Sequence, residues 1–82
     1  MPDDQSILGR IRDLVSEEDG LRARRSDGTL SASEEHQRLT AVETELDQCW
    51  DLLRQRRALR SAGRDADEAH TRPASEVEGY IG

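Results

Sequence analysis

Apolar residues recur along the first third of the chain at alternating steps of four and three, the repeat of a helix that packs on another helix. The stripe consists of Ile7, Ile11, Leu14, Glu18, Leu21 and Arg25, and Leu8 and Val15 widen it. Side-chain oxygens for the free amides of a first helical turn are available at Asp3, Asp4 and Ser6. Residues 26–28, Ser-Asp-Gly, are typical of a helix end. The pattern therefore predicts a helix over about residues 4–26.

A second stripe with the same alternation follows. Ser31 and Glu34 fit a capping box, and no helix breaker occurs before Gly63. The stripe consists of Leu39, Val42, Leu46, Cys49, Leu53, Arg56 and Arg60, with Trp50, Leu52 and Leu59 beside it. We expect a second helix over about residues 32–62, roughly 48 Å long against about 34 Å for the first, so that its Arg-rich end overhangs.

Together the two stripes predict an all-α fold, a two-helix antiparallel hairpin with a coiled-coil-like seam over residues 1–63. The predicted seam residues are Ile7, Ile11, Leu14, Leu21, Leu39, Val42, Leu46 and Cys49. If the chain turns at about residue 28 or 29, facing residues have numbers that sum to roughly 57.

Residues 64–82 lack this periodicity and are predicted to be a polar linker, over 64–75, and a C-terminal tail. The apolar residues of the tail are Val77, Tyr80 and Ile81. They either dock on the hairpin or on a partner, or belong to a frayed terminus.

The composition of the chain indicates that few apolar side chains are available to form a buried core. The chain has 15 Ile, Leu and Val among 82 residues and no Phe. Short chains poor in aliphatic residues commonly gain buried area by oligomerising. We therefore expect a homodimer, antiparallel, that forms a four-helix bundle.

Net charge and hydropathy limit the classes of partner. A formal charge of −6 disfavours a broad surface for nucleic-acid phosphates, although a local basic patch remains compatible with it. No apolar run approaches the roughly 20 residues that span a bilayer, and six acids lie in the first 20 residues, unlike a signal peptide. We expect no membrane association and a cytoplasmic location. A single Cys excludes an intrachain disulfide and a thiolate zinc cluster.

Carboxylates and imidazole near the predicted turn are the first candidate for chemistry. Glu17, Glu18, Glu35 and His36 would lie together at the loop end, and helical bundles build metal sites from Glu with a Glu-x-x-His pair. Here no acid stands three residues before His36. We therefore expect no metal and no other cofactor, and a seam position for Glu18 that pairs with His36 or Arg22.

Cys49 is the second candidate. A nucleophilic Cys needs an activating base, and His36 is more than three helical turns away. Its position between Leu46 and Leu53 favours a small, buried core residue. The alternative is a redox-sensitive thiol between chains.

Basic residues concentrate at the end of the second helix. Arg54, Arg56, Arg57, Arg60 and Arg64 occur with no acid among residues 52–64. They could pair with the acids of the tail or of an antiparallel copy, bind a protein partner, or bind nucleic acid, which the lack of aromatic residues near the run other than Trp50 disfavours. The predicted contact region consists of Trp50, Leu52, Leu53, Arg54, Arg56, Arg57 and Arg60, because an aromatic residue beside Arg is a common hot-spot composition.

The run 46–57, Leu-Asp-Gln-Cys-Trp-Asp-Leu-Leu-Arg-Gln-Arg-Arg, resembles a family of short, chiefly actinobacterial proteins catalogued as domain of unknown function 2630. Further matching pieces are 14–18, 34–39 and 77–80, so the likeness covers essentially the whole chain. The resemblance implies a small helical bacterial protein and no catalytic residue, substrate or cofactor.

The residues and the resemblance together favour a non-enzymatic helical interaction or scaffold module. We expect it to associate with itself and to contact a protein partner. The alternative is a small nucleic-acid-associated protein that uses the basic run 54–64.

Overall fold

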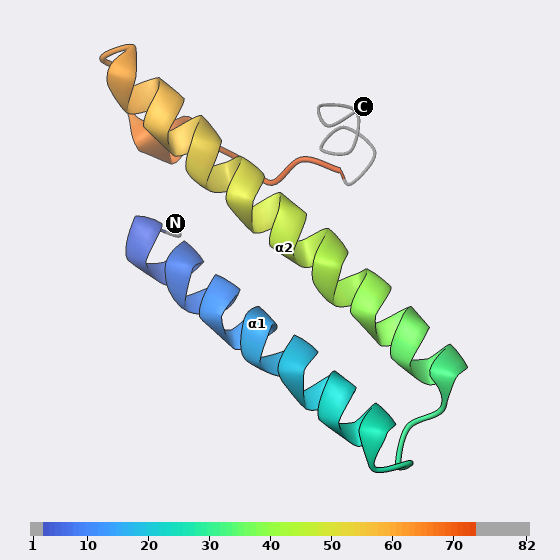
Figure 1. The fold of residues 1–82 in the computed structure, drawn as a ribbon. Helices are drawn as coiled ribbons and strands as arrows, with labels where there is room; N and C mark the ends of the chain where they lie inside the picture. The colour runs from blue at the N-terminus through green and yellow to red at the C-terminus, as the bar shows by residue number, and fades with distance from the viewer. Residues whose placement is uncertain (1–2, 74–82) are drawn as a thin grey trace.

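A computed structural model describes residues 3–73, which form two long helices and one short one. Helix α1 spans Asp4–Ser26, α2 spans Ala32–Ser61, and the 3-10 helix η1 spans Ala66–Glu68. α1 and α2 lie side by side and antiparallel, joined by a short loop, and α2 extends beyond the start of α1 (Figure 1). The predicted all-helical hairpin is confirmed, and α2 ends one residue before its predicted end.

The helix ends follow the signals in the sequence. The Asp3 carboxylate accepts a hydrogen bond from the Ser6 amide at 2.8 Å and caps α1. The Ser31 hydroxyl accepts from the Glu34 amide at 3.1 Å, and the Glu34 carboxylate accepts from the Ser31 amide at 3.3 Å, which completes the capping box of α2. Beyond α1 and α2, Gly28 and Gly63 have φ of 83° and 74°, a backbone that residues with a Cβ rarely adopt.

Two apolar clusters hold the helices together. The cluster near the loop consists of Leu14, Leu21, Leu30 and Val42, and the cluster at the open end consists of Ile7, Ile11 and Leu52. Leu46 and Cys49 contact both clusters, so the core is continuous along the hairpin. Among the predicted seam residues, Leu39, Leu46 and Cys49 are only half-buried, whereas Val42 and the four on α1 are buried.

Leu52 corrects the predicted seam of α2. It was expected beside the seam, in the contact region, but it is only 8% exposed and packs with Ile7 and Ile11. Leu46 and Leu53 also contact the cluster of Ile7 and Ile11, so the side of α2 that faces α1 is wider than the predicted stripe. Position 45, at the same spacing from Cys49 and Leu52, borders this side of α2 as well. Glu45 is accommodated there because its carboxylate binds the Arg10 guanidinium across the helix pair, with Nη2 to Oε1 at 2.8 Å.

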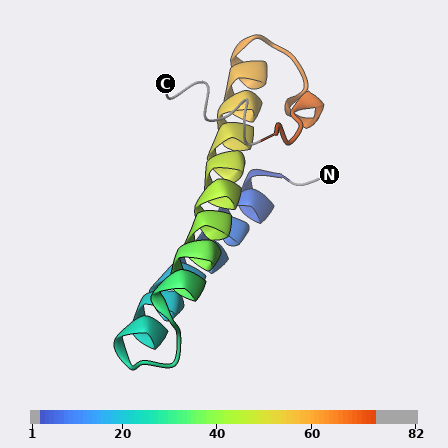
Figure 2. The ribbon, with the colours of Figure 1, turned by 90° about the vertical axis from the view of Figure 1, so that its right-hand side faces the viewer.

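Residues 64–73, predicted to be linker, pack against α2 instead (Figure 2). Ala66 in η1 is buried. The Gln55 side chain donates to the His70 carbonyl at 2.8 Å and accepts from the His70 amide at 3.3 Å, and Gln48 donates to the Arg72 carbonyl at 3.2 Å. Ala69 also packs on the cluster of Ile7 and Ile11, but the two Ala side chains are small and the longer side chains that hold the segment are polar, so hydropathy could not reveal it. The tail residues Val77, Tyr80 and Ile81 lie outside the described residues.

Neither α1 nor α2 is apolar over a stretch that could cross a membrane, as judged on residues 3–73.

Candidate functional site

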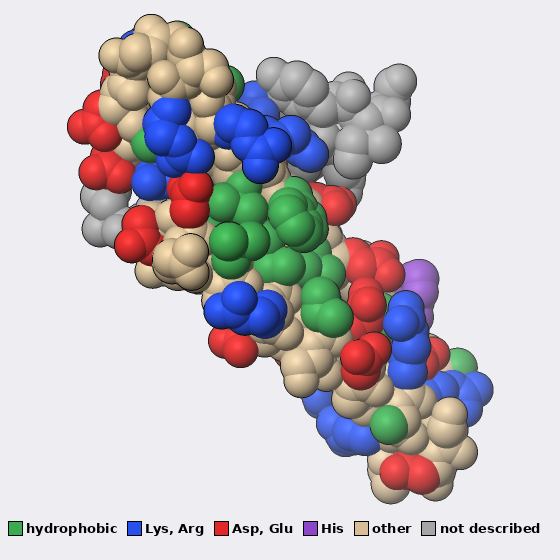
Figure 3. All heavy atoms as spheres, turned by 60° about the vertical axis from the view of Figure 1, so that its left-hand side comes forward, with side chains coloured by type: hydrophobic (Ala, Val, Ile, Leu, Met, Phe, Trp, Pro, Cys, Tyr) green, Lys and Arg blue, Asp and Glu red, His purple; other side chains and the backbone are tan. Residues whose placement is uncertain are grey.

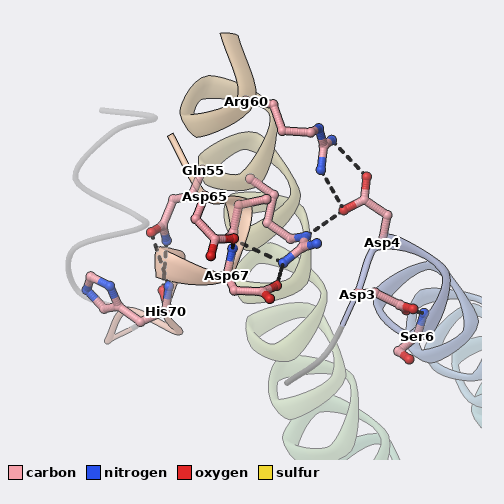
Figure 4. A network of polar contacts seen from close by, with 10 residues as sticks. Asp3, Asp4, Ser6, Gln55, Arg60, Asp65, Asp67 and His70 are labelled. Atoms are coloured by element: carbon pink, nitrogen blue, oxygen red, sulfur yellow. Dashed lines mark hydrogen bonds and ion pairs between the residues drawn. The ribbon is translucent and has the colours of Figure 1, made fainter. Parts of the chain in front are cut away.

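Arg56 lies at the open end of the hairpin, between α1, α2 and η1, and is 8% exposed. Its Nε donates to Asp4 Oδ1 at 2.5 Å, and its Nη1 donates to Asp67 Oδ1 at 3.0 Å and to the Ala66 carbonyl at 3.2 Å. Asp4 also accepts from Arg60, with Nη2 to Oδ2 at 2.8 Å (Figure 4). The hydrogen bonds from Arg60 and Arg56 hold the pKa of Asp4 below its usual range. These bonds occupy both arginines inside the molecule.

Arg56 and Arg60 therefore join α1, α2 and η1, although both were predicted in an exposed contact region. Arg60 remains exposed, but its guanidinium is bound to Asp4. Arg64 pairs with Glu68 at 2.5 Å in the same segment. Pairing with acids of residues 65–68 was among the expectations, whereas Asp4 was expected only to support the first turn of α1. The predicted register carried part of the signal, because it places Asp4 opposite residue 53, about one helical turn before Arg56.

Asp51 is the most buried charged residue of α2, at 1% exposed. Its Oδ2 accepts from Arg72 Nε at 2.9 Å and from Gln55 Nε2 at 2.9 Å, and its Oδ1 contacts Arg72 Nη2. The hydrogen bond from Arg72, supported by that from Gln55, outweighs desolvation and lowers the pKa of Asp51. This pair fastens residues 64–73 to α2. Sequence reasoning made no prediction for Asp51, and its position inside the run Cys-Trp-Asp-Leu-Leu was the available signal.

A third side of the hairpin carries apolar side chains that the two clusters do not bury. Trp50 is 47% exposed and Val15 is 44% exposed. Leu8, Leu46 and Leu53 are half-buried and contact the clusters from this side. We call these five residues the Trp50 face. Figure 3 shows hydrophobic side chains gathered on one face, with basic side chains at the upper border of the patch and acidic ones to its lower right.

The Trp50 face has its own spacing on α2. Leu46, Trp50, Leu53 and Arg57 follow one another at steps of four, three and four, so they form a second stripe beside the seam. Of the predicted contact residues, Trp50, Leu53, Arg54 and Arg57 lie on or next to this face, whereas Leu52, Arg56 and Arg60 are used within the hairpin.

On α2, four charged residues around the Trp50 face make no ion pair within residues 3–73. Arg54 and Arg57 follow the apolar stripe of α2, and Glu43 and Asp47 lie at its other end. Glu43, Arg54 and Arg57 are exposed, and Asp47 is half-buried. These charges are available to a partner.

The acidic residues and His36 near the loop, the first candidate for chemistry, lie on the surface of the hairpin. Glu18 pairs with Arg22 at 3.6 Å, one of its two predicted partners, and His36 is exposed. Over the described part of the chain no three side chains among His, Cys, Asp and Glu are grouped to hold a metal ion.

Cys49 is half-buried between the two clusters. Burial, with a smaller effect of the Glu45 carboxylate, raises the pKa of its thiol. The thiol therefore stays protonated at neutral pH, unlike an activated nucleophile.

Comparison with known proteins gives one family. The family described as "Protein of unknown function (DUF2630)" matches residues 3–82. Uncharacterised proteins of Mycobacterium bovis and of Mycobacterium tuberculosis strains CDC 1551 and H37Rv are each 60% identical over 81 residues, covering 99% of this chain and 93% of theirs. No solved structure matches. The match spans α1, α2 and η1 together, so the family sequence includes the segment that folds back on α2.

Proposed function

The chain belongs to the DUF2630 family, and from the geometry above we propose that it is a non-enzymatic helical interaction module that associates with itself through the Trp50 face. The observation that carries the proposal is the exposure of the single Trp of the chain among Leu8, Leu46 and Leu53. Large aromatic side chains contribute strongly to interface free energies, and they do so most when fully desolvated.

The chemistry of the remaining polar groups supports a binding role. Asp4 and Asp51 are bound to arginines that lower their pKa values, so neither carboxyl is suited to proton transfer near neutral pH. The raised pKa of Cys49 disfavours a thiolate. The charged residues at the open end hold secondary structure elements together.

The partner that we propose for the Trp50 face is a second copy of the same chain. A lone hairpin buries one side of each helix, and two hairpins packed through their Trp50 faces would form a four-helix bundle. Such a dimer would bury Trp50 and Val15 together with the half-exposed leucines. A different protein partner would then contact the surface that the dimer leaves open.

The alternative is nucleic-acid association through the basic run 54–64. Arg54 and Arg57 favour it, since neither has an ion pair within the described range. Arg56, Arg60 and Arg64 weaken it, because acids of the same chain already neutralise them. Two arginines of this run without an ion pair over residues 3–73, on a chain of net charge −6, give a small phosphate-binding surface.

The mass of the protein in solution tests the proposal. Light scattering coupled to size-exclusion chromatography should give about twice the 9.2 kDa chain mass. Trp50→Ala should move the protein toward the single-chain mass, because it removes the largest exposed apolar side chain. Trp50→Phe is the matched control and should keep most of the association. A wild-type protein that stays at the single-chain mass at hundreds of micromolar would contradict the proposal.

A further inference from the structure

We infer that two copies pair with their α2 helices antiparallel and crossing at Trp50, so that Glu43 and Asp47 of each copy face Arg57 and Arg54 of the other. This inference rests on the proposed function, because it specifies the partner and the orientation for the Trp50 face.

The order of residues along α2 is self-complementary about Trp50. Glu43 and Arg57 each lie seven residues from it, on opposite sides. Leu46 and Leu53 lie four and three residues away. A two-fold axis through Trp50 therefore brings Glu43 to Arg57 of the second copy and Leu46 to Leu53 of the second copy, each contact occurring twice.

Asp47 and Arg54 complete this pattern one residue further around the helix. They lie three and four residues from Trp50, so the same axis brings them together. On α1, Leu8 and Val15 of the Trp50 face flank Ile11, and antiparallel crossing of the α1 helices would bring Leu8 to Val15 of the second copy.

The pairing state of the charges supports this orientation. Other charged residues in the same stretch of α2, Glu45, Asp51 and Arg56, are bound to Arg10, Arg72 and Asp4. By contrast, Glu43, Asp47, Arg54 and Arg57 are without ion pairs over residues 3–73, and these four border the apolar face. An interface would satisfy them with opposite charges at both ends of its apolar centre.

Other orientations leave these charges mismatched. Parallel α2 helices would set Glu43 against Glu43 and Arg57 against Arg57, and like charges in contact disfavour association. Packing α2 on α1 of the second copy would direct Arg54 and Arg57 toward the start of α1. Of the two carboxylates there, Asp4 already binds Arg56 and Arg60, and Asp3 caps α1.

Charge reversal tests the orientation in the full chain. Sedimentation equilibrium would be measured for Arg57→Glu, Glu43→Arg and the double variant. Each single reversal places two like-charged contacts in the dimer and should weaken the dimer about tenfold or more. The double variant should return to within a few-fold of wild type. Residues 43 and 57 are about 21 Å apart along one helix, so this rescue can arise only between chains.

Arg38→Glu is the matched control, since Arg38 is exposed on α2 away from the Trp50 face and its reversal changes the net charge equally. It should leave the dimer constant within a few-fold. Far-ultraviolet circular dichroism of each variant reports whether the hairpin is retained, and the exposed positions 43 and 57 should tolerate the changes.

The outcomes separate the two proposals. A monomeric wild type overturns both. A wild-type dimer that Trp50→Ala weakens, while neither reversal weakens it or the double variant fails to recover, overturns the antiparallel orientation and leaves the proposed function standing. Weakening by both single reversals with recovery in the double variant supports both.

Discussion

At the scale of single residues, the molecule uses its few buried charges to hold segments together. Asp51 and Arg56 are both buried, and each is bound by side chains from another segment, Asp51 by Arg72 and Arg56 by Asp4 and Asp67. Breaking such a pair leaves an uncompensated charge in a desolvated position, which destabilises more than loss of an exposed pair. The stability of residues 64–73 on α2 should therefore depend strongly on Asp51.

Asp51 should make the protein sensitive to acid. Its pKa is lowered in the folded state, chiefly by Arg72, so its contribution to stability is complete above the unfolded value of about 3.9 and is lost as pH falls through the folded pKa. Asp51→Asn should lower the free energy of unfolding by roughly 1–3 kcal/mol at neutral pH and reduce its loss in acid. Urea unfolding at fixed protein concentration, near pH 6 and near pH 3, measures both effects. Asp13→Asn, at an exposed position of α1, is the control and should change little. Equal behaviour of the two variants would contradict a stabilising Asp51–Arg72 pair.

Cys49 should react slowly with thiol reagents in the native protein. Burial raises the pKa of its thiol and lowers the population of the reactive thiolate. The rate with an aromatic disulfide reagent should rise on addition of denaturant, which exposes the side chain. Equal rates in both conditions would show that the thiol is not protected by the two apolar clusters.

At the scale of elements, local signals in the sequence were sufficient for the helices. The capping residues Asp3 and Ser31 and the glycines at 28 and 63 define ends that the structure reproduces to within a residue or so. The three-four spacing gave the seam of α1 in full. On α2 the same spacing occurs in two adjacent rows, and Leu52 and Leu53 both contact the cluster of Ile7 and Ile11, so periodicity alone does not predict which of the two is buried.

The packing of residues 64–73 on α2 is a feature that the hydropathy pattern does not predict. Its attachment to α2 is made by Gln55, Asp51 and Arg72, and these polar bonds form between residues far apart in sequence. The composition of residues 64–73 is that of a linker. Only their bonding partners on α2 distinguish a segment that packs on the helix from a linker. Ion pairs between distant residues also separate the arginines of the predicted contact region. Arg56 and Arg60 bind acids of the same chain, whereas Arg54 and Arg57 form no ion pair within residues 3–73.

Helix α2 should depend measurably on its capping box. Ser31→Ala removes the hydroxyl that accepts from the Glu34 amide, and N-cap losses of this kind cost about 1 kcal/mol. Ser33→Ala is the matched control, because Ser33 lies inside the first turn, is exposed, and gains helix propensity as Ala. Thermal unfolding followed by circular dichroism should show a lower midpoint for Ser31→Ala only. A lower midpoint in both variants would indicate a general effect of hydroxyl removal in this turn.

At the scale of the whole molecule, six of the twelve arginines of the chain, Arg22 among them, form ion pairs with its own acids within residues 3–73. Arg10, Arg56, Arg60, Arg64 and Arg72 all bind carboxylates of the same chain. The net charge of −6 further repels phosphate at a distance. A protein interface uses the two remaining arginines of the basic run better than nucleic acid does, since it can present a carboxylate and an apolar surface together.

We accordingly expect no measurable oligonucleotide binding at physiological salt. Binding through Arg54 and Arg57 alone would release few counterions, with a slope of roughly 0.7–0.9 in the logarithm of affinity per phosphate contact, so it would vanish as salt is raised. Fluorescence anisotropy of labelled single-stranded and double-stranded oligonucleotides, over a range of salt, measures this slope. Arg54→Gln with Arg57→Gln should leave the anisotropy unchanged and weaken the dimer, because both arginines then lose the acids of the second copy. Micromolar binding that these two substitutions abolish, with no change in the dimer, would replace the interaction module by its nucleic-acid alternative.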